Sequence, residues 1–141
     1  MDRSKGGWAP TIGAALLITS GPSHDPNRKH LHVIVTKIAD DGAVVLIPII
    51  STTGGARDDD ACELKPGDHP FVTKPCFAFY ERAQVWETAV LQAMMEAGEC
   101  VLKPPASKSL LSRIIDGAAA SRRIDRRMKA LIAKVADPPP R

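Results

Sequence analysis

The sequence of 141 residues has no hydrophobic run long enough to cross a membrane. Its longest apolar run, residues 43–50, is far shorter than the roughly 20 residues that a membrane-spanning helix needs. Another apolar stretch, residues 12–18, follows Arg3 and Lys5 and faintly imitates a secretion signal, but no A-x-A cleavage pattern comes after it. We therefore expect no membrane protein and interpret residues 12–18 as a first strand.

The three cysteines are too few and too scattered for a disulfide framework. Cys62, Cys76 and Cys100 are odd in number and contain no C-x-x-C spacing, so a zinc knuckle is not indicated either. We predict three free thiols and a cytoplasmic location, where thiols stay reduced.

The sequence also lacks the common motifs of nucleotide binding and of nucleophilic catalysis. Gly6-Gly7 and Gly54-Gly55 match neither the phosphate-loop pattern nor the dinucleotide-binding pattern. There is no G-x-S-x-G elbow, and no cysteine has a context that suggests a lowered pKa. We expect no cofactor.

Two histidines, His30 and His32, lie two residues apart on a predicted strand and therefore point the same way. A metal site needs further ligands, and no third ligand has a compelling position, so we expect no metal. We expect His32 to be a hydrogen-bonded polar residue at a strand edge. For His69 we expect a hydrogen bond that fixes the turn at residues 67–70.

Length and charge describe one globular domain with an uneven charge distribution. The chain is 44% hydrophobic and 25% charged, which matches ordinary soluble proteins. Residues 1–106 carry 10 Lys and Arg against 13 Asp and Glu, whereas residues 107–141 carry 9 against 3. A polyanion would thus be met partly by the C-terminal element, although a solvated helix face has the same pattern.

The first two-thirds of the chain has strand patterns. Residues 31–36 alternate and are rich in β-branched side chains, and the turn Asp40-Asp41-Gly42 separates them from the apolar residues 43–50. This pattern predicts a hairpin whose second strand lies centrally in a strongly curved sheet or small barrel. We further predict a short strand at residues 61–64 and a last strand at residues 77–86.

The remainder of the chain has helical patterns. Residues 88–97 favour a helix that Gly98 ends, and another helix follows Pro104-Pro105 with Ser107 as its N-cap. Two apolar stripes mark amphipathic helices at the C-terminus: Leu110, Leu111, Ile114, Ile115 and Ala118, then Ile124, Met128, Leu131, Ile132 and Val135. The basic residues Arg122, Arg123, Arg126, Lys129 and Lys134 fall on the other side of the second helix.

These patterns predict a single α+β domain over residues 1–141. It would contain a compact β barrel over about residues 10–86, a short helix over about 88–98 and C-terminal helices over about 107–136. The stripes of the terminal helices, with Met94 and Met95, offer more apolar surface than such a barrel needs, so we expect a homodimer.

The polar loop of residues 21–30 is the strongest candidate for a site, because loops between strands often carry function. His24 could transfer a proton, Asp25 could orient it, and Arg28 and Lys29 could hold a phosphate. With no nucleophile of its own, such a site suits a substrate that brings one. RNA, with its 2′-hydroxyl, is such a substrate.

Two motifs resemble the PemK/MazF-type endoribonuclease toxins over about residues 10–100. The run R-K-H-L-H-V-I-V-T, which begins at Arg28, is similar to that family's arginine leading into a hydrophobic strand. The run P-I-I-S-T, residues 48–52, occupies the place of the family's P-[IL]-T-S motif. Ile50 stands where the family has threonine, so Ser51 or Thr52 would supply the hydroxyl.

The resemblance implies a small SH3-like β barrel, usually homodimeric, that cleaves single-stranded RNA without metal and is neutralised by an antitoxin protein. In that mechanism the 2′-hydroxyl attacks the adjacent phosphate. Arg28 would neutralise charge on the phosphorane, and Ser51 or Thr52 would hydrogen-bond the phosphate. From the chemistry, we expect His24 to be the general acid or base.

We expect Lys29, His30 and Arg57 to contribute to RNA binding. The alternative is a non-catalytic SH3-like barrel that binds a protein or a nucleic acid. A metal-dependent hydrolase that uses the histidines is a third hypothesis.

Overall fold

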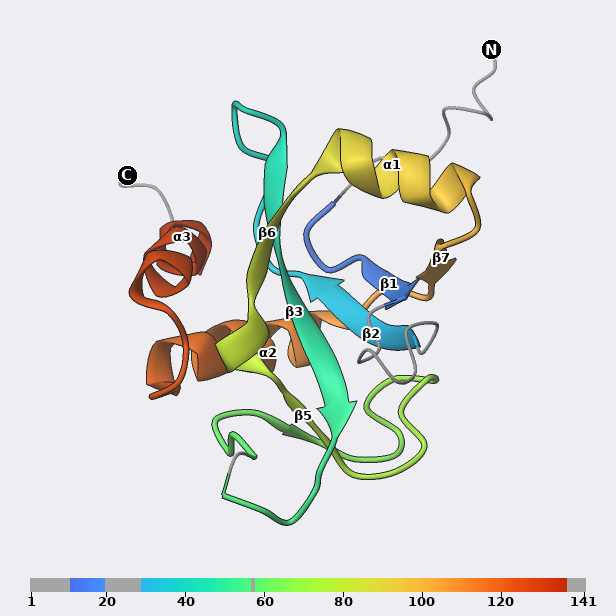
Figure 1. Ribbon diagram of the computed structural model, residues 1–141. Coiled ribbons are helices and arrows are strands. Elements are labelled where there is room, and N and C mark those ends of the chain that lie inside the picture. The colour runs from blue at the N-terminus through green and yellow to red at the C-terminus, as the bar shows by residue number, and fades with distance from the viewer. Residues whose placement is uncertain (1–10, 20–28, 57, 137–141) are drawn as a thin grey trace.

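The computed structural model describes residues 11–19, 29–56 and 58–136 of the chain. In this part the fold is α+β, with a seven-stranded antiparallel sheet and three α-helices (Figure 1). The elements in chain order are β1 (Ala15–Thr19), β2 (Lys29–Ile34), β3 (Ala43–Ser51), β4 (Glu63–Leu64), β5 (Cys76–Ala78), the 3₁₀ helix η1 (Tyr80–Arg82), β6 (Gln84–Glu87), α1 (Thr88–Glu96), β7 (Cys100–Lys103), α2 (Lys108–Ala120) and α3 (Arg126–Ala136).

The sheet has the order β4-β5-β3-β2-β1-β7, and β6 pairs with β3 as well. Among the described strands, β4 and β7 form the two ends and do not pair with each other, so the sheet is open. The long strand β3 pairs along one side with β2 and along the other with β6 in its first half and β5 in its last residues. Since β3 has neighbours on both sides, its apolar residues are buried from residue 43 to residue 49.

The α+β class, the hairpin of β2 and β3, and the C-terminal helices are confirmed. Ser107 caps α2 as predicted, because its Oγ accepts a hydrogen bond of 3.0 Å from the Leu110 N–H. Gly98, with φ +80°, follows α1 as its predicted stop. The pairings do not, however, close the sheet into the barrel that the strand patterns predicted.

Two strand predictions need correction. The predicted last strand at residues 77–86 is broken into β5, η1 and β6, because the Tyr80 side chain turns inward and is fully buried. Strand β7 was not predicted at all. It is only four residues long and lies at the sheet end, where Val101 and Leu102 are exposed, so it carries no hydrophobic alternation.

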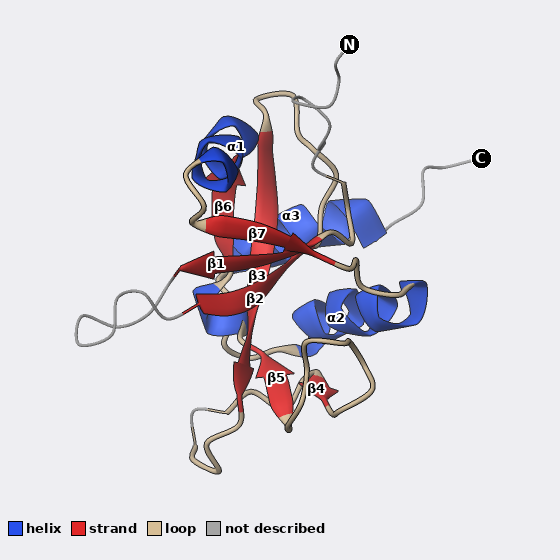
Figure 2. Ribbon diagram, turned by 90° about the vertical axis from the view of Figure 1, so that its right-hand side faces the viewer, coloured by secondary structure: helices blue, strands red, loops and turns tan. Residues whose placement is uncertain are grey.

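Helices cover both faces of the sheet (Figure 2). On one face, α1 contributes Leu91 to a core with Leu16, Ile18, Ile34, Val44 and Leu46. On the other, α2 and α3 contribute Leu110, Ile114, Ala118, Met128 and Ile132 to a core with Val33, Val45, Ile47, Ala78 and Tyr80. The stripes of the terminal helices are therefore used inside the fold, and Met94 and Met95 also pack against a core.

The three cysteines are free, as predicted, and all three are buried. Burial raises the pKa of each thiol, and that of Cys100 rises to about 11. None of the helices in the described ranges combines the length and the apolar character needed to cross a membrane.

Helix α2 packs closely at Gly117 against η1 and the residues just before β4. The Tyr80 hydroxyl donates a hydrogen bond of 2.6 Å to the Ile114 carbonyl oxygen, one turn before Gly117. A Cβ at residue 117 would overlap the Tyr80 hydroxyl and lie 2.9 Å from the Cys62 Cβ and 3.0 Å from the Ala61 carbonyl oxygen. Only glycine allows this contact, since backbone atoms cannot shift as a flexible side chain can.

We predict that Gly117→Ala destabilises the fold by about 1–3 kcal/mol, because it overpacks this contact. The loss would occur even though alanine is the better helix former by about 1 kcal/mol. Urea unfolding measures the change, and Ser112→Ala on the exposed face of α2 is the matched control. A Gly117→Ala variant as stable as the wild type would contradict the close contact.

Candidate functional site

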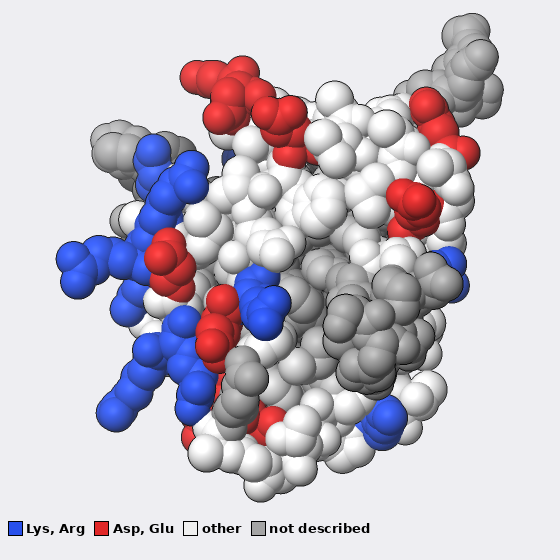
Figure 3. Space-filling model, in the orientation of Figure 1, with Lys and Arg blue, Asp and Glu red and all other residues white. Residues whose placement is uncertain are grey.

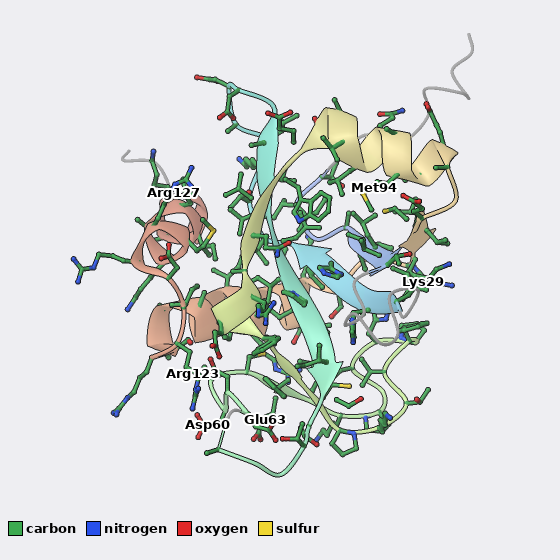
Figure 4. All side chains as sticks on the ribbon, in the orientation of Figure 1. Lys29, Asp60, Glu63, Met94, Arg123 and Arg127 are labelled. Atoms are coloured by element: carbon green, nitrogen blue, oxygen red, sulfur yellow. The ribbon has the colours of Figure 1, made fainter. Side chains whose placement is uncertain are left out.

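A cleft of about 320 Å³ lies where β2 begins and β3 ends, facing the loop of residues 70–76. Its polar lining consists of Lys29, His30, Ser51, Thr73 and Lys74. In Figure 4, Lys29 lies at the start of β2, on the opposite side of the molecule from the labelled arginines. Two lysines, a histidine and a serine thus border one cleft.

Antiparallel pairing explains why Lys29 and Ser51 meet. Leu31 pairs with Ile49 at the end of the β2–β3 ladder, and both side chains belong to the core under α2 and α3. Lys29 and Ser51 are each two residues beyond that pair, so they share its face of the sheet. Lys29 and Ser51 therefore lie on the core-facing side of the sheet, just beyond the point where the core ends.

The opposite wall of the cleft is held by His69, which is buried. Its Nε2 donates a hydrogen bond of 2.6 Å to the Pro104 carbonyl oxygen, and its Nδ1 accepts one of 3.0 Å from the Phe71 N–H. The predicted hydrogen bonding of His69, which fixes the turn at residues 67–70, is confirmed. The Lys103 ammonium lies 5.6 Å from the centre of the Phe71 ring, which lines the cleft.

The preceding turn is attached to α2 through Arg113. Its guanidinium donates hydrogen bonds to the Asp68 carboxylate at 3.1 Å and to the Glu63 carbonyl oxygen at 2.6 Å. The Lys65 N–H, and after it Arg113, lowers the pKa of Asp68. Helix α2 therefore positions the turn from which the cleft wall continues.

Of the two candidate hydroxyl groups, only that of Ser51 lines the cleft. The neighbouring Cys76 thiol donates to the Lys74 carbonyl oxygen at 3.3 Å. The Thr52 hydroxyl instead donates to the Pro75 carbonyl oxygen at 3.4 Å. Of these two candidates, Ser51 is therefore the one that the cleft includes.

The structure brings together Lys29, His30 and Ser51 among the predicted site residues. His24, Arg28 and Arg57 lie outside the described residues. The sequence analysis missed Lys74 and Phe71, which line the same cleft. No local pattern marks them, because they reach the cleft only when the His69–Pro104 hydrogen bond folds their loop back.

His32 differs from its expected place. It lies on β2, between β1 and β3, and is only 3% exposed, so it is not at an edge of the sheet. Burial lowers its pKa from 6.5 to about 4, and its Nδ1 is 2.9 Å from the His30 carbonyl oxygen. His32 is thus neutral near pH 7 and donates from Nδ1.

Within the described ranges, no group of three or more His, Cys, Asp or Glu side chains could hold a metal ion. Two of the three successive aspartates serve as backbone caps instead. Asp58 accepts from the Thr53 and Gly54 N–H groups at 2.9 and 2.8 Å, and Asp59 accepts from the Ala61 N–H at 3.0 Å.

Comparison of the chain with models of known protein families and with curated proteins finds no match.

We predict that His32 makes the fold sensitive to acid. The unfolded chain protonates this histidine near pH 6.5, whereas the folded chain keeps it neutral down to pH about 4. Stability is therefore lost as the pH falls from 6.5 to about 4, by about 3 kcal/mol in total.

Urea unfolding at several pH values measures this loss. His32→Gln keeps a donor for the His30 carbonyl. It should reduce the slope of the unfolding free energy against pH by the equivalent of about one bound proton over this range. Equal slopes for the variant and the wild type would show that His32 is not the responsible group.

Proposed function

We propose that the protein binds single-stranded RNA in the cleft and cleaves it without a metal ion. The observation that carries this proposal is the cleft itself, where Lys29, His30 and Ser51 meet Lys74. Ammonium groups and a hydroxyl suit a phosphate diester, and an imidazole transfers protons near neutral pH. Phe71, which is 43% exposed, offers a ring on which a base can stack.

The proposed reaction uses the 2′-hydroxyl of the RNA as nucleophile. His30 accepts the proton of this hydroxyl while its oxygen attacks the adjacent phosphorus. Lys29, Lys74 and the Ser51 hydroxyl stabilise the negative charge of the pentacoordinate phosphate. The bond from phosphorus to the 5′-oxygen then breaks, and that oxygen takes up a proton. The products are a 2′,3′-cyclic phosphate and a 5′-hydroxyl.

The resemblance to PemK/MazF-type toxins adds Arg28 to this proposal, and the proton-transfer chemistry of an imidazole adds His24. Arg28 immediately precedes Lys29 in the chain, and its proposed role is to neutralise charge on the phosphorane. His24 is the proposed acid that protonates the leaving oxygen. The proposal also includes an SH3-like fold for the sheet, membership of a toxin–antitoxin pair and an antitoxin protein as partner.

A homodimer remains part of the proposal, but its surface is not the pair of helical stripes. Exposed apolar side chains at β7, Val101 and Leu102, and Val90 on α1 are the alternative for self-association. Light scattering at micromolar concentration should give about twice the monomer mass of 15.1 kDa. A mass of 15.1 kDa would contradict the dimer.

The main prediction is that purified protein cleaves mixed-sequence RNA in the presence of EDTA. Ser51→Ala should lower the rate about 10²- to 10³-fold, as is typical when one transition-state donor is removed. Lys74→Ala should weaken cleavage as well, and Arg28→Ala should nearly abolish it. End-group analysis should find cyclic phosphate and 5′-hydroxyl ends.

Lys108→Ala is the control, because Lys108 is exposed and lines none of the clefts described. Lys103→Ala would be an unsuitable control, since the Lys103 ammonium lies over the ring of Phe71, which lines the cleft. Tight RNA binding without cleavage would indicate the non-catalytic module. Cleavage that EDTA abolishes would indicate a metal-dependent hydrolase. Unchanged cleavage rates in both Ser51→Ala and Lys74→Ala would exclude the cleft as the site of cleavage.

A further inference from the structure

A second cationic surface lies on the C-terminal side of the molecule, away from the cleft. It consists of the exposed side chains of Arg122, Arg123, Arg126, Arg127, Lys129 and Lys134, which we call the α3 face. Figure 3 shows Lys and Arg gathered on this side, while acidic side chains gather at the top of the same view. Asp125 is the one acidic residue between residues 122 and 134.

Ion pairing does not explain this cluster. Arg123 lies 3.8 Å from Glu81 and donates to the Ala56 carbonyl oxygen. In the part of the chain that the structure describes, the other five cations form no ion pair and no side-chain hydrogen bond. Asp125 serves instead as a cap, because its carboxylate accepts from the Arg127 and Met128 N–H groups at 3.0 and 3.4 Å.

Helix stability does not explain it either. Arg126 and Arg127 occupy the first turn of α3, where the helix dipole disfavours positive charge. Lys129 lies three residues after Arg126, so these like charges are neighbours on the helix surface and repel one another. The helix dipole and the repulsion between like charges therefore both disfavour the α3 face, and a bound polyanion would reduce that repulsion.

The α3 face is nevertheless held firmly. Met128 and Ile132 are buried in the core on the opposite side of the helix. The Ser121 hydroxyl donates to the buried Asp59 carboxylate at 2.6 Å and accepts from the Arg123 and Ile124 N–H groups. The turn before α3 is thus fixed, and the cations project from a preorganised surface.

A groove of about 200 Å³ extends this surface toward the β2–β3 hairpin. Lys37 from the hairpin and Arg127 and Lys134 from α3 line it, together with Asp41. Cations therefore stand on both sides of the groove. No large apolar side chain of α3 is exposed among its described side chains, so this helix lacks the residues that insert into a lipid surface.

We propose that the α3 face binds the phosphate backbone of RNA as a second contact outside the cleft. Four of its six cations are arginines, whose planar guanidinium groups bind phosphate oxygens in pairs. The choice of RNA as the polyanion rests on the proposed function, whereas the phosphate-binding surface does not. The face gives affinity and no sequence preference, because phosphate contacts carry no base information.

The test compares two double variants that remove the same charge. Arg126→Gln with Lys129→Gln changes the α3 face, and Lys65→Gln with Lys108→Gln changes exposed lysines outside it. The probe is a fluorescent 2′-O-methyl RNA of about 20 nucleotides, longer than typical single-strand sites and unable to undergo 2′-hydroxyl attack. Anisotropy measures its affinity over a range of salt concentrations.

The α3-face variant should lose about 10- to 30-fold in affinity at 0.1 M salt, and the salt slope should flatten by about 1.4, which is two single-strand phosphate contacts. The control should change less than threefold. Cleavage of a dinucleotide substrate, too short to span both sites, should have an unchanged kcat/KM in the α3-face variant. Its thermal stability should not fall, because the substitutions remove repulsion.

Two results would overturn this inference. Equal affinities of the two double variants for the RNA would exclude the α3 face as a phosphate contact. Binding to vesicles of anionic lipid that exceeds RNA binding, and that only the α3-face variant loses, would assign the surface to a membrane. If the wild type binds RNA through this face but cleaves no RNA, the proposed function fails and the inference stands.

Discussion

The close packing of α2 against Tyr80 of η1 is the contact on which the rest of the structure depends. The Tyr80 hydroxyl reaches the Ile114 carbonyl because Gly117 has no side chain to prevent it. From this position α2 closes one core with Leu110 and Ile114, and Arg113 on its outer side holds the turn that begins the cleft wall. A displacement of α2 would therefore move the cleft, although no residue of α2 lines it.

The charge of the protein is unevenly distributed between its body and two cationic patches. Up to residue 106 the chain carries more acidic than basic side chains, so the body of the protein repels a polyanion in general. Lys29 and Lys74 make a local exception at the cleft, and the α3 face makes a larger one. Two attractive patches on a repelling body orient a long polyanion rather than bind it in many arrangements.

The sequence predicted what depends on local chemistry. The β2–β3 hairpin followed from alternation and a turn, and the start of α2 followed from the cap at Ser107. What it could not supply depends on distant partners. β7 forms because β1 lies beside it across more than 80 residues of chain, and Lys74 reaches the cleft because His69 bonds Pro104.

The same limit applies to the apolar stripes and to the site. Helical spacing identified the apolar faces of α2 and α3 correctly, but it could not say whether a core or a second subunit covers them. Ser51 and Thr52 were equivalent candidates in sequence, and the structure separates them, because Ser51 lines the cleft whereas the Thr52 hydroxyl donates to the Pro75 carbonyl oxygen. Pattern identifies a residue's chemistry, whereas the fold decides which neighbours it has.

The central place of β3 has a consequence for how the chain folds during synthesis. Of the strands that pair with β3, β5 begins 25 residues and β6 begins 33 residues after β3 ends, and the helices of its larger core come last. While the ribosome adds these residues, a nine-residue apolar strand has one partner, β2, and a mostly uncovered surface. Non-local pairing of this kind slows folding and favours association between incomplete chains. The nascent chain is thus most vulnerable between the emergence of β3 and that of α2.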